Sequence, residues 1–300
     1  MSRSPPVAEC VVSCQNVLGE SVFWSAATQT VGWIDGVEPA LWQFHPDNGR
    51  HESRRIDVPA PLGMIAATSD PRLLVMAHRS GVALYDLHDG HQTAVADPEC
   101  GRAGIGYNDA KVDPSGCLWL GTYDDSEVEP RACLWRLQHG RAPALAESGV
   151  AVFNGPAFSP DGKIIYVSDS IGRRILAYDI GERALSGRRV FVQLRPEDGL
   201  PDGLTVDAEG ALWCAHWDGA CVSRYAPSGE QVLRIALPVP RVTSVAFGGA
   251  QLDTLYITTA RYGLSAEQLA LAPLAGGLFA VRPKVHGIAP ALLPLPFVLR

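Results

Sequence analysis

Short apolar stretches alternate with polar turns along the chain, and three segments share one pattern. Residues 111–121 (KVDPSGCLWLG), 157–167 (AFSPDGKIIYV) and 205–215 (TVDAEGALWCA) each contain a short apolar run, a polar turn ending in glycine, and a second apolar run. Further apolar stretches, such as 133–137 and 175–180, follow before the next turn. Apolar runs of this length, bounded by turn residues, predict β-strands.

The same unit recurs along the whole chain. Weaker copies occupy residues 21–49, 64–90 and 243–283, and comparable positions recur about every 40 to 48 residues. This spacing holds four strands per unit, and one unit cannot bury its own apolar face. We therefore predict an all-β fold, a six-bladed β-propeller with four-stranded antiparallel blades, in which residues 1–300 form a single domain. An open array or a β-sandwich is the alternative.

Two details complete the predicted architecture. Closure of the ring requires the chain ends to meet, and we interpret the apolar residues 7–12 and 292–299 as parts of one blade. The only good helical stretch is 265–271, which follows Gly263 and is expected to decorate the last blade.

Composition narrows the classes of partner. With 47% hydrophobic and 19% charged residues, the 300-residue chain is typical of a globular protein with a sizeable core. A net charge of -7 and the absence of a basic stripe argue against a nucleic-acid partner. We see neither a signal peptide nor an apolar run of membrane-spanning length, so we expect no membrane association, a cytoplasmic location and, by default, a monomer.

The cysteines do not indicate a metal site. There are seven of them, without any C-x-x-C pair, in a chain too long to need disulfides for stability. Reduced, mostly buried thiols are the better interpretation, because a structural zinc site needs paired ligand spacing.

Acidic and amide residues recur just before the first apolar strand of four repeats. They are Glu20, Asn108, Asn154 and Asp202. In a propeller, the innermost strand of each blade faces a shared central cavity, so we expect these side chains to converge. Carboxylate and amide oxygens suit a hard divalent ion such as Ca²⁺, Mg²⁺ or Mn²⁺. Asn-Gly, Asp-Gly and Asn-Asp are also common turn dipeptides, but turn chemistry does not explain why the polar residue precedes the inner strand each time.

Several long motifs, in order along nearly the whole chain, resemble the SMP-30/gluconolactonase/regucalcin family and most closely its bacterial sugar lactonases of the xylonolactonase type. The motifs are residues 18–20 (LGE), 108–122 (NDAKVDPSGCLWLGT), 154–162 (NGPAFSPDG), 201–203 (PDG) with 207–213 (DAEGALW), and 258–261 (TTAR) with 275–279 (AGGLF).

This resemblance implies metal-dependent hydrolysis of a sugar (aldono) lactone, a pentonolactone or hexonolactone, to the sugar acid. It implies one divalent ion, Ca, Zn, Mn, Mg or Fe(II), held by Glu20, Asn154 and Asp202, with Asp202 also transferring protons. The residues expected near the substrate are Asn108, Asp109, Tyr107, Asp125 and Glu127. The alternative function is a calcium-binding propeller of the regucalcin type with little or no catalysis, and an esterase or phosphotriesterase is a third possibility.

The chain departs from the family pattern at one position. Relatives commonly carry a substrate-binding arginine two residues before the asparagine of the Asn-Asp pair, where this chain has Gly106. Arg102, Tyr107 or the acidic loop 124–127 are candidates to replace that fork of donors. Among the other polar side chains, His216 is the histidine that we expect nearest the cavity, and Trp24 and Trp217 are candidates for sugar stacking.

Overall fold

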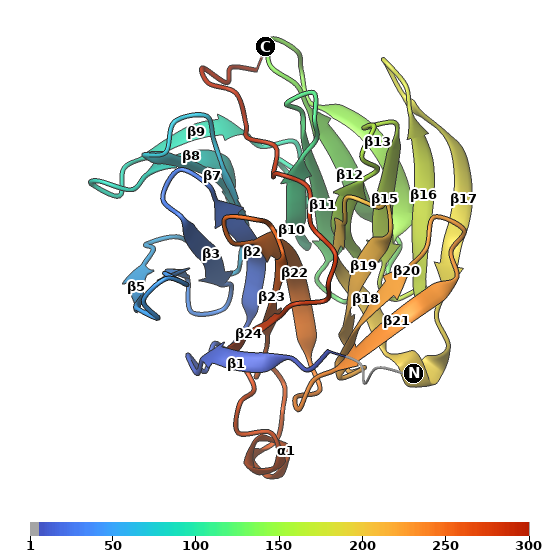
Figure 1. The fold of residues 1–300 in the computed structure, drawn as a ribbon. Helices are drawn as coiled ribbons and strands as arrows, with labels where there is room; N and C mark the ends of the chain where they lie inside the picture. Colours follow the sequence, from blue (N-terminus) through green and yellow to red (C-terminus); the bar gives the residue numbers. More distant parts are fainter. Residues whose placement is uncertain (1–5, 300) are drawn as a thin grey trace.

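The computed structural model describes residues 6–299, and it confirms the predicted architecture. Twenty-four strands form six four-stranded antiparallel sheets, which surround a central axis as the blades of a propeller (Figure 1). In each sheet the strands follow one another from the axis outward, and neighbouring inner strands contact each other around the ring.

The strands occupy four equivalent positions in the blades. The inner strands are β2 (Gly19–Ser25), β6 (Leu62–Ala67), β10 (Ile105–Val112), β14 (Phe153–Phe158), β18 (Leu200–Val206) and β22 (Val242–Gly248). The second strands are β3 (Thr30–Asp35), β7 (Leu73–His78), β11 (Leu118–Asp124), β15 (Ile164–Asp169), β19 (Leu212–Trp217) and β23 (Thr254–Thr259). The third strands are β4 (Ala40–Phe44), β8 (Gly81–Asp86), β12 (Ala132–Leu137), β16 (Arg174–Ile180), β20 (Cys221–Tyr225) and β24 (Leu278–Val281). The outer strands are β5 (His51–Arg55), β9 (Gln92–Ala96), β13 (Ala144–Val150), β17 (Leu185–Gln193), β21 (Gln231–Ala236) and β1 (Glu9–Val12).

Burial decreases from the axis-side strands to the rim. Every residue of β3 and β23 is buried, whereas every residue of β5 is exposed. The core lies between blades, since one apolar cluster combines Trp119 of β11 with Phe153 of β14 and Val167 of β15. A blade therefore gains its apolar burial from its neighbours, which is the packing that the repeat pattern predicts.

The N-terminal strand closes the ring. β1 pairs antiparallel with β24, so the last blade has the order β1-β24-β23-β22 and joins the two ends of the chain (Figure 1). The prediction that residues 7–12 contribute to closure is correct, but residues 292–299 do not share this blade.

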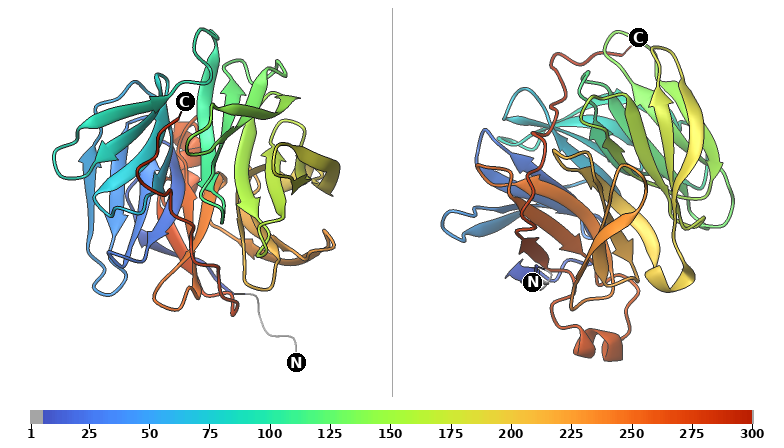
Figure 2. Two further views of the ribbon diagram at one scale, coloured as in Figure 1. Left: turned by 90° about the horizontal axis from the view of Figure 1, so that it is seen from above. Right: turned by 45° about the vertical axis from the view of Figure 1, so that its right-hand side comes forward.

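The C-terminal segment instead runs across the side of the ring where the inner strands end (Figure 2). It makes a bridge between Gly287 and Asp207, and a second one between Leu293 and Thr68. Farther on, the Gly140 amide donates to Val298 O (2.8 Å). The sequence suggested a strand because residues 292–299 are apolar, but Leu293 and Phe297 are buried against the second and third blades as side chains of an irregular segment.

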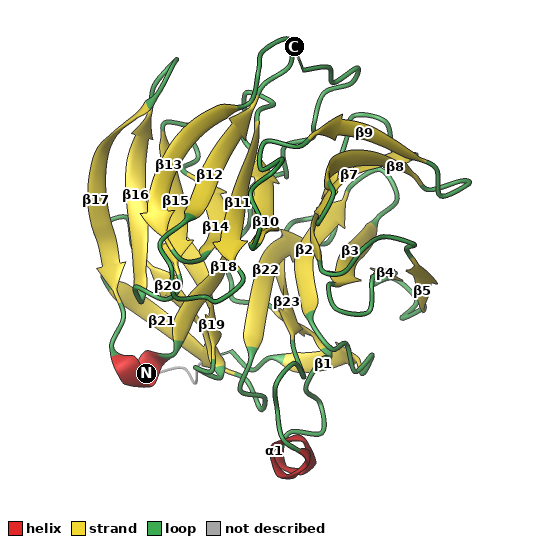
Figure 3. Cartoon of the chain, turned by 180° about the vertical axis from the view of Figure 1, so that it is seen from behind, coloured by secondary structure: helices red, strands yellow, loops and turns green. Residues whose placement is uncertain are grey.

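One α-helix occurs in the described residues, and it lies where the sequence predicts it. Helix α1 (Ala266–Leu271) projects from the connection between β23 and β24 (Figure 3), and a short 3-10 turn, η1 (Pro196–Asp198), precedes β18. Ser265 caps α1 by accepting from the Gln268 amide, while Gln268 Oε1 accepts from the Ser265 amide. This reciprocal capping box defines the start of the helix.

All six inner strands have a register shift close to the end at which they begin. The irregularity lies between Glu20 and Phe23 in β2, between Asn154 and Ala157 in β14, and at equivalent places in the other four inner strands. A bulge places two residues opposite one and changes the direction of nearby side chains. The bulge therefore lies at the same position of the repeat as the recurring polar residues.

Buried aspartates fix the turn that follows two of the inner strands. Asp207 accepts hydrogen bonds from the amide of Ala211 (3.0 Å), from Trp213 Nε1 (2.8 Å) and from Arg224 Nε (2.7 Å). Asp113 makes the same indole contact with Trp119 in the third blade. The recurring aspartate thus ties a turn to the tryptophan of the second strand.

Replacing Asp207 by alanine is expected to lower the free energy of unfolding by about 3 kcal/mol, because it leaves the buried Trp213 indole N–H and the Arg224 Nε–H without their acceptor. Urea unfolding followed by tryptophan fluorescence measures the loss. Asp161→Ala is the matched control, since Asp161 lies in the corresponding turn of the fourth blade but its side chain is 58% exposed. Equal stability losses in the two variants would contradict this assignment.

Candidate metal centre

A large cavity lies at the end of the ring where the inner strands begin. It has a volume of about 740 Å³, and its wall contains all four recurring polar residues, Glu20, Asn108, Asn154 and Asp202. These residues come from the first, third, fourth and fifth blades. The sequence-based expectation that they converge on a shared cavity therefore agrees with the structure.

The two asparagines hold each other in place. Asn108 Nδ2 donates to Asn154 Oδ1 (2.7 Å) and to Phe153 O (2.9 Å), while Asn154 Nδ2 donates to Ser170 Oγ (3.1 Å). Ser170 Oγ in turn donates to Pro201 O (2.8 Å), beside Asp202. A carbonyl oxygen accepts through two lone pairs, so Asn154 Oδ1 retains one acceptor site after this contact.

Asp202 carries the least satisfied carboxylate of the group. It is 4% exposed, and its Oδ1 is buried without a hydrogen-bond partner among the described residues. Burial raises the pKa of Asp202 well above its usual range, and the charge of Asp109 raises it further. Gly203 permits this close packing, because a Cβ there would lie 2.8 Å from Ser244 Cα in the sixth blade.

Glu20 lines the same cavity, and the pKa of its carboxyl group is raised like that of Asp202. Burial within the ring raises its pKa, and the charges of Asp202 and Asp109 act in the same direction. Its Oε2 accepts only the amide of Ser21 (3.1 Å). Two buried carboxylates with raised pKa values, neither paired to a basic side chain of the described residues, form a site that a cation would stabilise.

The donor set fits a hard divalent ion. Across residues 6–299, no three His, Cys, Asp or Glu side chains gather into a metal cluster, so a cation here depends on amide oxygens as well as on Glu20 and Asp202. Asn154 Oδ1 supplies such an oxygen, and the unpartnered Asp202 Oδ1 is the atom that most needs a positive partner. Oxygen ligands of this mixed type are those that Ca²⁺, Mg²⁺ and Mn²⁺ prefer.

The residues predicted to contact substrate separate into two groups. Asn108, Asp125 and Glu127 line the main cavity. The Tyr107 hydroxyl instead donates to Asp97 Oδ1 (2.6 Å) and accepts from the Glu99 amide (2.9 Å), so its polar atom is committed between blades. Tyr107 also lines the main cavity, but it is 2% exposed and packs in the apolar core, so a substrate contact through its hydroxyl stays a prediction.

Asp109 faces a different space. It lines a second cavity of about 410 Å³ together with Lys111, at the end of the channel toward which the inner strands run. Burial raises the pKa of Asp109 to about 7, and burial lowers the pKa of Lys111, whose Nζ donates to Leu204 O (2.5 Å). Asp109 therefore influences the centre through its charge and is not placed to contact a ligand in the main cavity.

Sequence reasoning missed the basic and aromatic side chains at the cavity mouth. Arg79, Arg241 and Tyr262 line it from connections between strands, and Tyr123 lines it from the end of the second strand β11. Arg102, one of the candidates to compensate for Gly106, pairs with Glu99 instead and lies outside this wall. No period in the sequence marks these residues, since loops at the mouth differ from blade to blade.

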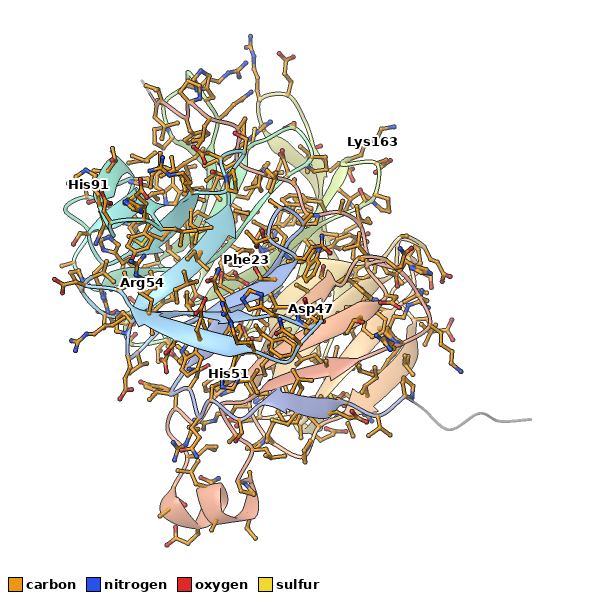
Figure 4. The ribbon with its side chains drawn as sticks, turned by 60° about the vertical axis from the view of Figure 1, so that its left-hand side comes forward. Phe23, Asp47, His51, Arg54, His91 and Lys163 are labelled. Atoms are coloured by element: carbon orange, nitrogen blue, oxygen red, sulfur yellow. The ribbon has the colours of Figure 1, made fainter. Side chains whose placement is uncertain are left out.

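The remaining aromatic and histidine expectations are partly met. Trp217 lines the main cavity, whereas Trp24 lines the second one. His216 is fully buried and lies outside the main cavity. Its Nδ1 forms a hydrogen bond with Asp198 O (2.8 Å). His51 and His91 are exposed at the outer edge of the ring, as Figure 4 shows.

The chain is similar to several known proteins over most of its length. The model of the SMP-30/Gluconolactonase/LRE-like region matches residues 18–261. A 6-deoxy-6-sulfogluconolactonase of Pseudomonas putida is 35% identical, with 95% of this chain and 97% of that protein covered. An L-arabinolactonase of Azospirillum brasilense is 34% identical, with 95% and 94% covered.

Solved structures agree with this similarity. The crystal structure of a calcium-binding protein, regucalcin, from Agrobacterium tumefaciens superimposes with a TM-score of 0.89 at 27% identity, covering 97% of this chain and 98% of that one. Within residues 6–299, no helix has the length and apolar character required to cross a bilayer. The cytoplasmic location and the monomeric state stay predictions.

Proposed function

This chain belongs to the SMP-30/gluconolactonase/LRE-like family, and from that premise we propose that it is a lactonase that opens a sugar (aldono) lactone to the sugar acid with the aid of one divalent cation. One observation carries the proposal: oxygen atoms of Glu20, Asn154 and Asp202, drawn from three blades, line one cavity that also has room for a small substrate. Similarity to two named lactonases over most of the chain supports the substrate class.

The proposed ligands of the cation are Glu20, Asn154 and Asp202. A divalent ion held there would polarise the lactone carbonyl and lower the pKa of a neighbouring water molecule. The chain's own contribution is to hold these oxygens in position through the hydrogen bonds from Asn108 to Asn154 and from Ser170 to Pro201. A cavity closed by packed blades also keeps the number of competing water molecules small.

Asp202 is the proposed proton carrier. Its carboxylate has two oxygens, so with one oriented to the cation the other could accept the proton that the attacking water loses. The C–O bond of the lactone ring then breaks, and the same proton passes to the departing ring oxygen. The products are one carboxylic acid and one new hydroxyl group, which balances the addition of water. Asn108 lines the cavity, and its Oδ1 is the proposed acceptor for a substrate hydroxyl.

A binding protein without turnover is the second candidate function. Gly106, where relatives carry a substrate-binding arginine, favours it, as does the structural similarity to a protein named as calcium-binding. In that case Glu20, Asn154 and Asp202 would bind a cation, and the cavity would have no catalytic role.

Turnover of a lactone panel distinguishes the two functions. The panel contains D-glucono-δ-lactone, D-xylono-γ-lactone and L-arabino-γ-lactone, and a pH-stat records the acid released above the spontaneous rate. We expect saturable turnover of at least one of them. A rate equal to the spontaneous background for every member, with purified protein supplied with divalent ions, would leave the binding function as the better account.

A further inference from the structure

The wall of the main cavity contains an ion pair that joins two blades at its mouth. Arg79 Nη2 donates to Asp125 Oδ1 (2.5 Å) and Arg79 Nη1 donates to Asp125 Oδ2 (3.1 Å), a two-bond, parallel contact. Arg79 belongs to the connection between β7 and β8 in the second blade, and Asp125 follows β11 in the third. Both residues line the cavity.

An aromatic ring supports the guanidinium from one side. The Cζ atom of Arg79 lies 5.6 Å from the ring centre of Tyr123. That ring occupies the space beside Gly106, since a Cβ on Gly106 would lie 2.4 Å from Tyr123 Cε1. The glycine therefore makes room for the Tyr123 ring, and the ring in turn orients Arg79.

Both partners stand on rigid loops. Arg79 lies in a two-residue connection, in which the Ser80 amide donates to His78 Nδ1 (3.2 Å) and Gly81 has a φ of 114°. The Asp125 amide donates to Gly104 O (2.9 Å), and the adjacent, fully buried Asp124 accepts from Arg131 Nε (2.8 Å). The ion pair is thus held in one geometry before any ligand binds. Less side-chain entropy is therefore lost when a ligand binds to it.

The pair also keeps unused hydrogen-bonding capacity. A guanidinium has five N–H donors, and Arg79 donates to Asp125 and, through Nη1, to Ile105 O (3.3 Å), so its Nε–H and one Nη2–H have no acceptor among the described residues. The Asp125 carboxylate has further lone pairs, and Glu127 adds an acceptor on the same wall. Donors and acceptors side by side match neighbouring hydroxyl groups, because each hydroxyl both donates and accepts.

We propose that Arg79, held by Asp125 and Tyr123, is a specificity-determining residue that binds neighbouring hydroxyl groups of a polyhydroxylated lactone, a role that rests on the proposed lactonase function. The alternative is a surface ion pair that only joins two blades. That alternative predicts little effect on any substrate, since the Arg79 side chain is 32% exposed and the Asp125 side chain 43% exposed, and such pairs contribute little to stability.

The test compares a hydroxylated lactone with one that lacks hydroxyl groups. In Arg79→Met we expect kcat/KM for the preferred sugar lactone to fall by about 10- to 100-fold, the effect of losing a charge-assisted hydrogen bond. For δ-valerolactone we expect kcat/KM to stay within about twofold of wild type. Gly106→Ala should reproduce part of the loss, because its methyl group displaces the Tyr123 ring.

The control variant is Arg72→Met. Arg72 pairs with Asp86 at the other end of strand β7, where its side chain is 67% exposed, and both lactones should retain wild-type kinetics. Equal losses on both lactones in Arg79→Met, or no loss on either, would overturn the proposal.

Binding of D-gluconolactam, an amide analogue that is not hydrolysed by this route, gives a readout that does not depend on turnover. We expect calorimetry to show a weaker affinity in Arg79→Met than in Arg72→Met. If wild type binds the lactam but opens no lactone, the proposed lactonase function fails while the hydroxyl-binding role stands. Equal lactam affinity in the two variants would contradict the hydroxyl-binding role.

Discussion

Asp202→Ala is expected to lower kcat/KM for lactone opening by about a thousandfold or more, since it removes a cation ligand and the proton carrier together. The free carboxylate oxygen of Asp202 is buried and has no other partner, so no neighbouring side chain is placed to replace it. Initial rates in a pH-stat, corrected for spontaneous hydrolysis, measure the loss.

Asp202→Asn separates the two roles of this residue. Asparagine keeps an oxygen that can face a cation but carries no charge and cannot accept a proton, so we expect weakened but measurable cation binding by calorimetry, with turnover strongly reduced even at saturating cation. Asp179→Ala serves as the control, because Asp179 is exposed on the third strand of the fourth blade and pairs only with Arg189. Turnover in Asp202→Ala close to that of the control would remove this residue from the mechanism.

Removing divalent ions is expected to reduce turnover to the spontaneous rate. Without a cation, burial raises the pKa values of Glu20 and Asp202, with smaller contributions from neighbouring carboxylates, so both retain a proton at pH values where ordinary carboxyl groups are charged. Protein treated with EDTA and desalted should regain activity on addition of one of Ca²⁺, Mg²⁺, Mn²⁺, Zn²⁺ or Fe²⁺. Full activity after chelation, with metal content below one ion per ten chains, is the result that would contradict a metal requirement.

The same carboxylates give the cation effect a pH dependence. Their pKa values are raised in the folded state, so the cation-free protein loses stability as pH rises above the usual carboxyl range of about 4, and a bound cation offsets that loss. We therefore expect the rise in Tm on adding the activating ion to be larger at about pH 8 than at about pH 5. A thermal shift that is independent of pH would argue that these two carboxylates are not the ligands.

The repeat unit made the architecture predictable. Strand and turn patterns such as those at 111–121 and 205–215 predict the local structure, and the spacing between them predicts the number of blades. The four polar residues before the inner strands could be assigned to one cavity because equivalent positions of a propeller meet at its axis. Both inferences depend on features that repeat.

Structural features that do not repeat could not be predicted from the sequence. Residues 292–299 have the apolar composition of a strand, yet they pack as an irregular segment, because the outer position that they would have filled belongs to β1. Asp109 adjoins Asn108 but lies in the bulge of β10 and lines the second cavity, whereas Tyr107 lines the main cavity with its hydroxyl bonded to Asp97. Arg79 is 29 residues upstream of Asn108 and reaches the cavity only through the pairing of separate loops.

The way in which β1 completes the last blade has a consequence for biosynthesis. Cys10 pairs with Phe279, so a strand that is made early must wait for a partner that is made 269 residues later. Chains emerge from the ribosome N-terminus first, and contacts between such distant residues form slowly. Until residue 281 has been released, the nascent chain exposes the open edge of its final sheet, and this is the interval in which it is most vulnerable to aggregation.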